Sequence, residues 1–380
     1  MSDIQPFQIN VDEAILLDLK QRLANTRWPE AELVEDWSQG TPLAYLKTVC
    51  DYWQQDYNWR RCEAEINQYP QFITEIDGLD IHFLHIESPH AGAAPLVMTH
   101  GWPGSIVEFL KVIKPLTDPT AYGGNAADAF HLVIPTMPGY GFSAKPLTPG
   151  WGIEKFGATW TTLMDRLGYP QYFAQGGDWG SVVTHSIGVT ETRNCIGAHV
   201  NMALVSPGDE LMTNLSELEK KALASIQHYL EWDSGYSKEQ ATRPQTVGYG
   251  LVDSPAGLAG WILEKFWAWT DNNGHPEDAL TKDEMLDDIM FYWVTATGAS
   301  AARLYWESFN AALGPKAPID IPFAYSCFPK DIFLASKRWY EERCSDLRYY
   351  NALEKGGHFA ALEQPEVFVD EVRAAFRTMR

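Results

Sequence analysis

Three polar residues in this sequence each follow a short apolar run of the kind that forms a buried strand. Asp178 lies in a Gly-Gly-Asp-Trp-Gly stretch (176–180) behind the apolar run 172–174. Asp331 comes after the strand-like run 322–326, and His358 comes after the run 347–352. A nucleophile, an acid and a histidine in this chain order, each just past the carboxyl end of a strand, are typical of a hydrolytic triad.

The stretch around Asp178 is interpreted as a strand, a sharp turn and a helix, with the helix over 181–189. Such a turn exposes its central residue at the top of a sheet, and glycines are needed where a Cβ would collide with a neighbouring element. This geometry is the nucleophile elbow of the α/β-hydrolase fold, which is therefore the predicted fold class. The exposed residue is an aspartate, whereas a serine is usual at this position.

An aspartate at the elbow restricts the chemistry. A carboxylate that attacks an sp³ carbon forms an alkyl ester, and water then cleaves that ester at the carboxyl carbon of Asp178, which regenerates the enzyme. A serine that attacks the same carbon would form an ether, and an aspartate that attacks an ester or amide would form a labile anhydride. The residue type therefore points to the opening of an epoxide or an alkyl halide and away from esterase activity.

The second half-reaction, cleavage of the ester, needs a base. We expect His358, oriented by Asp331, to take a proton from water. The sequence also places Asp320, Asp346 and Glu354 near Asp331, so spacing alone leaves them as alternatives for the acid.

The same half-reaction needs an oxyanion hole, for which two backbone N–H groups are candidates. One belongs to Trp179, the residue after the nucleophile, and the other belongs to Trp102, in the loop after the strand-like run 95–99. His100, in the same loop, is interpreted as a residue that holds the loop in place.

Two leaving groups remain possible at this stage. A halide leaves as a stable anion and needs only N–H donors, which tryptophan supplies. An epoxide oxygen leaves as an alkoxide, which a phenol can hydrogen-bond or protonate. Composition does not choose among the tyrosines of the predicted lid, which are Tyr229, Tyr236, Tyr249, Tyr292 and Tyr305.

The elements that must position these residues divide the chain into four parts. Residues 1–75 are interpreted as an N-terminal helical segment that packs on the core, with no strand before residue 71. Residues 76–205 alternate strands and helices, which predicts a mainly parallel central sheet with helices on both faces. Residues 206–315 are interpreted as a helical lid insertion rich in aromatic residues. Residues 316–380 complete the α/β-hydrolase core.

Periodicity and capping patterns give the individual elements. Helices are predicted over 11–27, 43–57, 153–167, 215–227, 255–269, 281 onward and 366–379, the sixth with a capping box at its start. Strands are predicted over 71–76, 80–87, 95–99, 131–135, 172–174, 322–326 and 347–352, the first two joined by a hairpin turn at Asp77-Gly78.

Composition excludes several classes of function. The formal net charge of -21 argues against binding to nucleic acid or to an anionic membrane surface. The five cysteines are scattered without metal-ligand spacing, so we expect unpaired thiols and neither a metal site nor a disulfide framework. The start of the chain has no signal sequence, and no apolar run reaches membrane-spanning length. We expect a cytoplasmic protein that needs no cofactor.

Several longer motifs resemble one family, the epoxide hydrolases of the microsomal and juvenile-hormone type, and they extend over nearly the whole chain. These motifs are His100–Ser105, Gly176–Ser181, Gly356–Glu363, Ala241–Pro244 and Asp253–Leu258, together with Pro6-Phe7 and Arg27–Pro29 near the start. The resemblance implies that the first part of the chain is the N-terminal segment of that family. We expect this protein to differ from the eukaryotic members in having no N-terminal membrane anchor.

The resemblance also implies roles for individual residues. The nucleophile of the family falls on Asp178 and its histidine on His358, and its acid, often a glutamate after a Phe-Pro pair, falls on Asp331. The two tyrosines that assist ring opening fall on Tyr236 and Tyr305.

We therefore predict an enzyme that opens an apolar epoxide with water to a vicinal diol through a covalent ester. A haloalkane dehalogenase with the same triad, or a catalytically silent receptor of the same fold, is the alternative. The epoxide, its enantiomer and assembly into a homo-oligomer are left open by the sequence.

Overall fold

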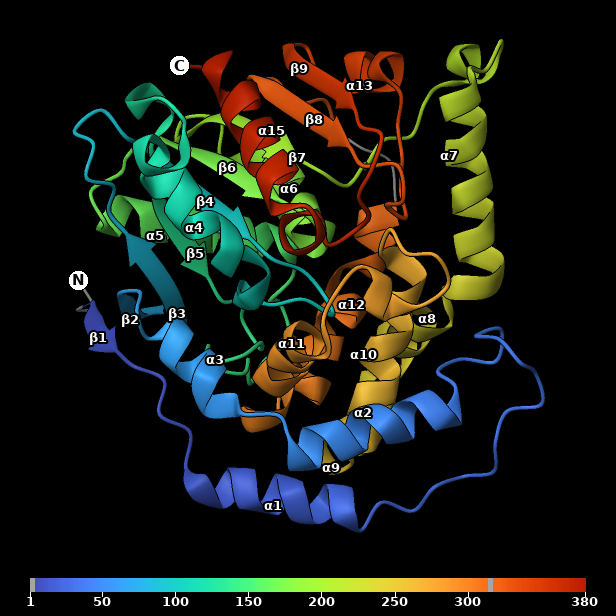
Figure 1. The fold of residues 1–380 in the computed structure, drawn as a ribbon. Helices are drawn as coiled ribbons and strands as arrows, with labels where there is room; N and C mark the ends of the chain where they lie inside the picture. The colour runs from blue at the N-terminus through green and yellow to red at the C-terminus, as the bar shows by residue number, and fades with distance from the viewer. Residues whose placement is uncertain (1–3, 314–316) are drawn as a thin grey trace.

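The structure, a computed structural model, describes residues 4–313 and 317–380. One sheet of nine strands runs through it in the order β1-β2-β3-β5-β4-β6-β7-β8-β9 (Figure 1). Strands β1, β2, β3 and β5 pair antiparallel, and every pairing from β5 through β4 to β9 is parallel. The bounds are β1 (Gln5–Phe7), β2 (Gln71–Ile76), β3 (Leu79–Ile86), β4 (Ala94–Thr99), β5 (Phe130–Pro135), β6 (Tyr172–Gly176), β7 (Cys195–Val200), β8 (Phe323–Cys327) and β9 (Leu347–Ala352). The mainly parallel sheet of the α/β-hydrolase fold is confirmed.

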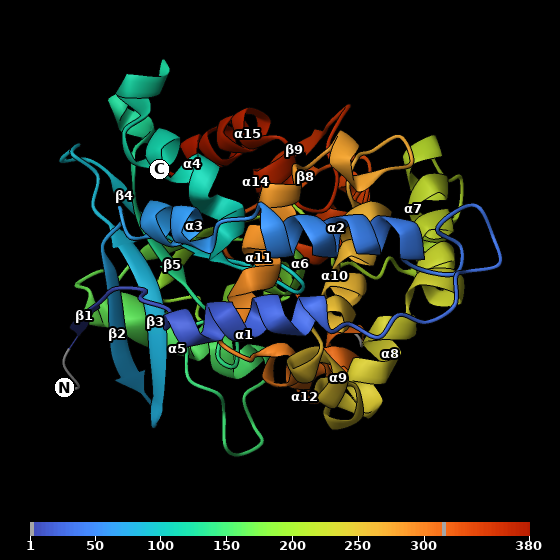
Figure 2. The same cartoon turned by 60° about the horizontal axis from the view of Figure 1, so that its bottom comes forward.

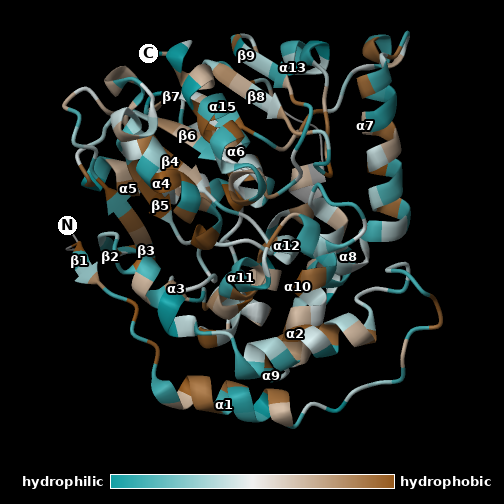
Figure 3. Cartoon of the chain, viewed as in Figure 1, coloured by the Kyte–Doolittle hydropathy of each residue, from teal (hydrophilic) through white to brown (hydrophobic). Residues whose placement is uncertain are grey.

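Helices cover both faces of this sheet, as parallel strands require. Helix α4 (Leu110–Thr117) packs with α15 (Pro365–Arg377) on one face, and α5 (Ile153–Arg166) packs with α6 (Asp178–Thr190) on the other (Figures 1 and 2). The outer helices α1 (Glu13–Ala24) and α7 (Glu217–His228) show both hydrophilic and hydrophobic residues in Figure 3, which is typical of helices with one buried face. Short elements complete the core: η1 (Ile106–Phe109), η2 (Pro119–Tyr122), η3 (Ala126–Asp128), α13 (Lys337–Arg343) and α14 (Ala360–Glu363).

Between β7 and β8 the chain leaves the sheet and forms the predicted helical lid. Figure 1 shows these helices, in yellow to orange, beside the end of the sheet toward which β8 points. The capping box at the start of α11 is present, with Thr281 and Glu284 bonded reciprocally. The lid elements are η4 (Asp209–Met212), α7 (Glu217–His228), η5 (Tyr229–Asp233), α8 (Gly235–Thr242), α9 (Pro244–Asp253), α10 (Pro255–Trp269), η6 (Pro276–Asp278), α11 (Lys282–Val294) and α12 (Gly298–Leu313).

The N-terminal segment contacts the lid as well as the sheet. Its helices α1 (Glu13–Ala24), α2 (Leu43–Gln55) and α3 (Trp59–Ile66) lie along the lid helices α10 and α11 (Figure 2). The Tyr57 hydroxyl and the Arg61 guanidinium each lie 2.7 Å from a carboxylate oxygen of Asp287 in α11. The segment therefore holds the lid against the rest of the molecule.

Two elements of this segment differ from the prediction. Strand β1 precedes residue 71, where no strand was expected, and α3 was not predicted. Strand β1 has three residues and pairs with β2, which is more than 60 residues away in the sequence. No local pattern therefore predicts it. Strand β2 also spans residue 75, the boundary expected between the first two parts of the chain.

None of the helices in the described ranges is both long and apolar enough to cross a bilayer.

Candidate active site

The elbow after β6 holds Asp178 in the strained backbone conformation that the sequence predicts. Asp178 has a φ of 49°, a left-handed value that is rare for a residue with a Cβ, and it is the first residue of α6. A Cβ on Gly180 would lie 1.9 Å from the carbonyl oxygen of Thr99, and one on Gly176 would lie 2.1 Å from the carbonyl oxygen of Gly180. Only glycine therefore allows the elbow to pack this closely against β4.

The three residues of the predicted triad meet at the ends of their strands. His358 Nε2 lies 3.1 Å from Asp178 Oδ2, and His358 Nδ1 lies 2.7 Å from Asp331 Oδ1. The His358 and Asp331 side chains are buried, whereas the Asp178 side chain keeps 14% of its surface exposed. The alternatives for the acid make other contacts or face solvent: Asp320 accepts from Ser345, Asp346 pairs with Arg348, and Glu354 is exposed.

Two carboxylates control the charge of His358. Burial alone would lower the pKa of its imidazole, but Asp331 and Asp178 overcome this effect and hold the pKa well above its usual value. Burial raises the pKa of Asp331, and the positive charge of His358 opposes that rise. With its pKa raised in this way, His358 is a cation that lies between Asp178 and Asp331.

A backbone donor is already bonded to the candidate nucleophile. The N–H of Trp102 donates to Asp178 Oδ1 at 2.6 Å. A Cβ on Gly101 would lie 2.1 Å from the same oxygen, so the loop approaches Asp178 this closely because residue 101 is glycine. Trp179 is the second residue of α6, and the first four N–H groups of a helix have no acceptor within it.

His100 holds this loop, in agreement with its interpretation from the sequence. Its Nδ1 lies 3.0 Å from the carbonyl oxygen of Gly101, and its Nε2 accepts the N–H of Met137 at 3.2 Å. Burial lowers the pKa of His100 to about 4, so the ring is neutral. With both nitrogens bonded to the backbone, His100 is not available as a base.

The structure separates the five tyrosines of the lid. Tyr236 in α8 stacks on the Trp102 indole with centroids 4.8 Å apart, and Tyr305 in α12 meets the same indole edge-on at 5.8 Å. Their own rings are 5.7 Å apart. Tyr292 donates to the carbonyl oxygen of Gly104, and Tyr249 is 69% exposed. The structure therefore brings the two tyrosines expected from the resemblance together beside Asp178.

Tyr229 is a third phenol in this group. Its hydroxyl donates to Ser237 at 2.9 Å and lies 3.4 Å from that of Tyr236. Burial raises the pKa of both Tyr236 and Tyr305 well above the usual value, with the charge of Asp178 acting in the same direction. Both phenols therefore keep their protons and can donate them.

The loop that carries His358 is held by a residue to which sequence reasoning gave no role. Glu363 accepts the N–H groups of Gly357 at 3.2 Å and Phe359 at 3.0 Å, on either side of the histidine. It also accepts the N–H of Asp271, next to α10, at 2.7 Å. Burial raises the pKa of Glu363 to about 7, and these backbone donors oppose the rise.

A buried lysine behind Tyr236 was also missed. The Lys265 ammonium lies 4.5 Å from the centroid of the Tyr236 ring and 2.7 Å from an oxygen of Asp233. The other oxygen of Asp233 accepts the indole N–H of Trp269 at 2.5 Å. Lys265 and Trp269 are four residues apart in α10, so they lie on one face of the helix. Their shared partner, Asp233, cannot be identified from the sequence alone.

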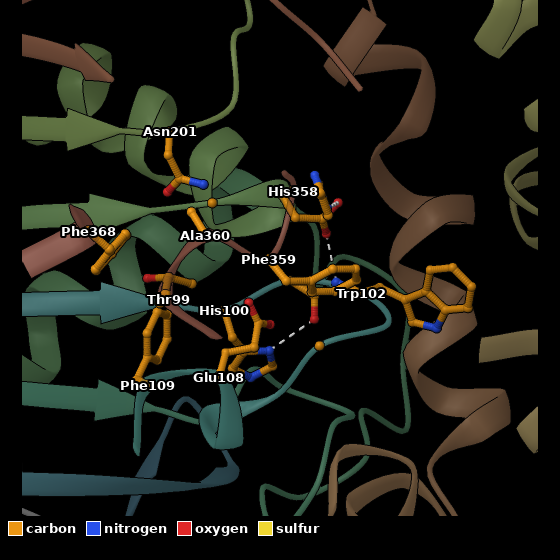
Figure 4. A pocket seen from close by; sticks show the side chains of 15 residues that line it. Thr99, His100, Trp102, Glu108, Phe109, Asn201, His358, Phe359, Ala360 and Phe368 are labelled. Carbon is orange, nitrogen blue, oxygen red and sulfur yellow. Dashed lines mark hydrogen bonds and ion pairs between the residues drawn. The ribbon is translucent and has the colours of Figure 1, made fainter. Parts of the chain in front are cut away.

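A small cavity and a larger groove lie next to the residues of the triad. A cavity of about 10 Å³ is lined by Asp178, His358, Trp102 and Glu108 among others (Figure 4). A larger groove of about 830 Å³ lies between the 36–40 loop, η5 and α10, and it reaches Trp269 and Asp331. Its aromatic lining consists of Trp37, Tyr229, Trp232, Trp267 and Trp269.

Comparison with known proteins identifies the family. Residues 4–109 match the family described as epoxide hydrolase N terminus, and residues 94–236 match the alpha/beta hydrolase fold. A Stigmatella aurantiaca (strain DW4/3-1) protein, provisionally named an epoxide hydrolase, is 52% identical over 99% of this chain and 86% of its own length. Juvenile hormone epoxide hydrolase 1 of Ctenocephalides felis is 36% identical over 99% of this chain and 86% of its own length.

A solved structure agrees with these relatives over the full length. The crystal structure of juvenile hormone epoxide hydrolase from Bombyx mori superposes with a TM-score of 0.90 at 32% identity, covering 100% of this chain and 95% of that one. The sequence motifs, the assembled triad and these full-length relatives agree, and the chain belongs to the epoxide hydrolase family of the α/β-hydrolase fold.

Proposed function

We propose that this epoxide hydrolase opens its substrate with Asp178 as the nucleophile and frees the product with water activated by His358. The observation that carries this proposal is the contact of His358 with both Asp178 and Asp331 at 3.1 Å and 2.7 Å. The geometry supports an aspartate that is first alkylated and then regenerated. The product of one turnover is a vicinal diol.

In the first step Asp178 Oδ2 attacks a carbon of the epoxide. The new bond joins that oxygen to the carbon, and the bond between the carbon and the ring oxygen breaks. Tyr236 and Tyr305 donate hydrogen bonds to the ring oxygen and supply the proton that it needs as it becomes a hydroxyl. The other carboxylate oxygen, Oδ1, stays on the Trp102 N–H, where it becomes the carbonyl oxygen of the ester.

In the second step water attacks the carboxyl carbon of the ester. Formation of the ester removes the negative charge of Asp178, which is one of the two charges that raise the pKa of His358. The imidazolium therefore gives up its proton more easily, to the phenolate left by ring opening, and the neutral ring, held by Asp331, takes a proton from the attacking water. The N–H groups of Trp102 and Trp179 hold the oxyanion. As the intermediate collapses, His358 returns its proton to the departing diol oxygen and then takes the carboxyl proton of Asp178, which restores both the carboxylate and the imidazolium.

The surroundings of Asp178 favour an epoxide over an alkyl halide. The indole N–H of Trp269 is bonded to Asp233 and is therefore not free to bind a halide. Two protonated phenols lie beside the nucleophile and suit an alkoxide leaving group. The assembled triad also argues against a silent receptor.

The aromatic groove supports an apolar substrate that enters between η5 and α10. Ligand sites are commonly lined by aromatic side chains with a few polar groups at the reacting end. Here the five aromatic residues of the groove lead toward Trp269, whose ring centroid is 5.0 Å from that of His358.

We also expect a cytoplasmic location, which fractionation of the native cells tests.

Replacement of His358 by glutamine tests the proposed roles of Asp178 and His358. The variant keeps Asp178 and both tyrosines, so it should form the ester but not cleave it. Mass spectrometry of the intact protein after mixing with a reactive epoxide should show one added epoxide mass, and peptide mapping should place that mass on Asp178. The absence of an adduct from an epoxide that the wild type turns over would refute the proposal.

A further inference from the structure

The cavity beside the triad contains an acid for which the mechanism above has no use. Glu108 lies in η1, and its side chain lines the cavity together with Asp178 and His358. In Figure 4 Glu108 lies beside His100 on one side of the cavity, and Asn201 and Ala360 lie on the other. An acid kept at this position suggests a ligand between it and the triad.

The size and the lining of the cavity suit a single water molecule. Its volume of about 10 Å³ is close to the roughly 10–15 Å³ that one buried water requires. Polar groups around it include Glu108, Asn201 and Thr99. The Thr99 hydroxyl is buried and has no hydrogen-bond partner within the described residues, which a water molecule would supply.

The backbone makes room for the Glu108 carboxyl group at this position. A Cβ on Gly104 would lie 1.5 Å from Glu108 Oε1 and 2.5 Å from its Cδ. The carboxyl group therefore occupies the space that a side chain at residue 104 would take.

The lid helix α11 fixes the loop that leads to Glu108. Tyr292 in α11 donates to the carbonyl oxygen of Gly104 at 2.6 Å. Ser105 donates to Asp288 in the same helix, also at 2.6 Å. These two hydrogen bonds hold the carboxyl group of Glu108 in a defined place beside the triad.

We propose that this cavity binds the hydrolytic water and that Glu108 orients it. The proposal rests on the function proposed above and adds a residue to its second step. One proton of the water points to His358 Nε2, the other to Glu108, and the oxygen faces the carboxyl carbon of Asp178. As the water oxygen bonds to that carbon, one water proton passes to His358, which returns it to the diol oxygen as the ester bond breaks in the collapse that follows.

The surroundings of Glu108 favour the neutral form of its carboxyl group. Burial raises the pKa of Glu108 well above its usual value, and the charge of Asp288 adds to that rise. The charges of His358 and Asp178 also act on Glu108, the first lowering its pKa and the second raising it. A neutral carboxyl group still has an oxygen that only accepts, and this is the acceptor that the second water proton needs.

The proposal separates the two half-reactions, so single-turnover kinetics test it. Excess enzyme is mixed with an epoxide and quenched in acid, and the ester and the diol are followed in time. Glu108→Leu should slow ester cleavage by about 10²-fold, the typical cost of a misplaced reactant, while the ester forms at nearly the wild-type rate. In the steady state kcat and KM should fall together, which leaves kcat/KM nearly unchanged.

Three further variants distinguish water binding from packing. Glu108→Gln keeps a donor and an acceptor and should restore most of the cleavage rate. Gly104→Ala should displace the carboxyl group and behave like Glu108→Leu. Val107→Ala removes apolar packing from the same short helix η1 at a buried residue that does not line the cavity, and it should leave the ratio of the two rates unchanged.

Two results would overturn the role of Glu108. One is wild-type ester cleavage in Glu108→Leu, and the other is an equal loss of both steps in that variant with no recovery in Glu108→Gln. Neither affects the proposed function, because a failure there would appear in the wild type as diol formation without any ester on Asp178.

Discussion

At the scale of single residues, the charge of Asp178 determines what its neighbours can do. While Asp178 is ionised, His358 is held as a cation between two acids. In the proposed cycle, formation of the ester removes one of these acids and lets His358 act as a base, so the same histidine would suit both halves of the cycle. The two tyrosines keep their protons because burial raises their pKa values.

The change in charge predicts a shift in pH dependence. The pKa of His358 is raised in the free enzyme and should be lower in the ester, because the charge of Asp178 is gone. The rate of ester cleavage should fall as the pH falls, since protonation removes the base, and the midpoint should lie below the pKa of His358 in the free enzyme. Single-turnover rates against pH and NMR titration of the imidazole give the two values. A midpoint at or above the free-enzyme pKa would contradict this account.

The tyrosines should act on ring opening alone. Tyr236→Phe and Tyr305→Phe should each slow ester formation by about 10²-fold, at the lower end of what a general acid contributes. The double variant should be slower than either single one, because each phenol partly replaces the other. Tyr249→Phe is the control, since Tyr249 is 69% exposed. Rapid quenching measures ester formation directly, and unchanged rates in the double variant would exclude both residues.

The residues that sequence alone identifies are those with a local pattern. Asp178 and His358 each follow a pair of glycines behind an apolar run, and spacing also predicts Asp331. Glu363 and Lys265 have no such pattern, because their contacts with Asp271 and Asp233 join parts of the chain that are distant in sequence. The sequence therefore predicts the reacting groups better than the groups that hold them.

At the scale of elements, the site depends on how the lid is attached to the core. Helix α7 begins at Glu217, after the N-cap Ser216. Its Glu219 accepts two hydrogen bonds from Arg338, at 2.5 Å and 2.6 Å, and one from Ser336 at 2.6 Å. These bonds lower the pKa of Glu219 to about 2, the Arg338 contribution being the largest.

Replacement of Glu219 by glutamine should therefore weaken the fold in a pH-dependent way. A lowered pKa stabilises the folded state above the unfolded value of about 4.3, and that stabilisation is lost as the pH falls toward the folded value of about 2. The loss at pH 7 should be about 2 kcal/mol, as for a hydrogen bond to a charged group. Denaturant unfolding at several pH values measures it. Glu217→Gln is the control, since the Glu217 side chain is 90% exposed. A difference that does not shrink in acid would contradict the assignment.

Elements with end signals in the sequence were predicted well. Helix α10 starts at Pro255 behind the N-cap Ser254 and ends at Trp269, as expected, and β9 spans 347–352 as expected. Strand β1 and helix α3 were missed because β1 requires its pairing with β2 and α3 has only eight residues.

At the scale of the whole molecule, the N-terminal segment, the lid and the sheet form one packed body. Trp53 in α2 is 1% exposed, and its indole N–H lies 3.3 Å from the sulfur of Met290 in the lid helix α11. The same helix holds the loop before Glu108 through Tyr292 and Asp288. The N-terminal segment thus reaches the site through the lid.

Removal of the Trp53 side chain tests this connection. Trp53→Ala should lower the free energy of unfolding by about 3–5 kcal/mol, as for other buried tryptophans. Amide exchange should quicken in α11 as well as in α2, because the two helices share the contact. Trp306→Ala is the control, since Trp306 is 54% exposed. Faster exchange confined to α2 would contradict the coupling of the segment to the lid.

One turnover in water enriched in ¹⁸O tests the central claim most directly. If Asp178 is alkylated and then hydrolysed, the diol takes its new oxygen from the carboxylate, and the heavy oxygen enters Asp178. Mass spectrometry should therefore find the label in the peptide that contains Asp178 and none in the diol from the first turnover. A labelled diol with an unlabelled protein would show that water attacks the epoxide itself, and the account would be wrong.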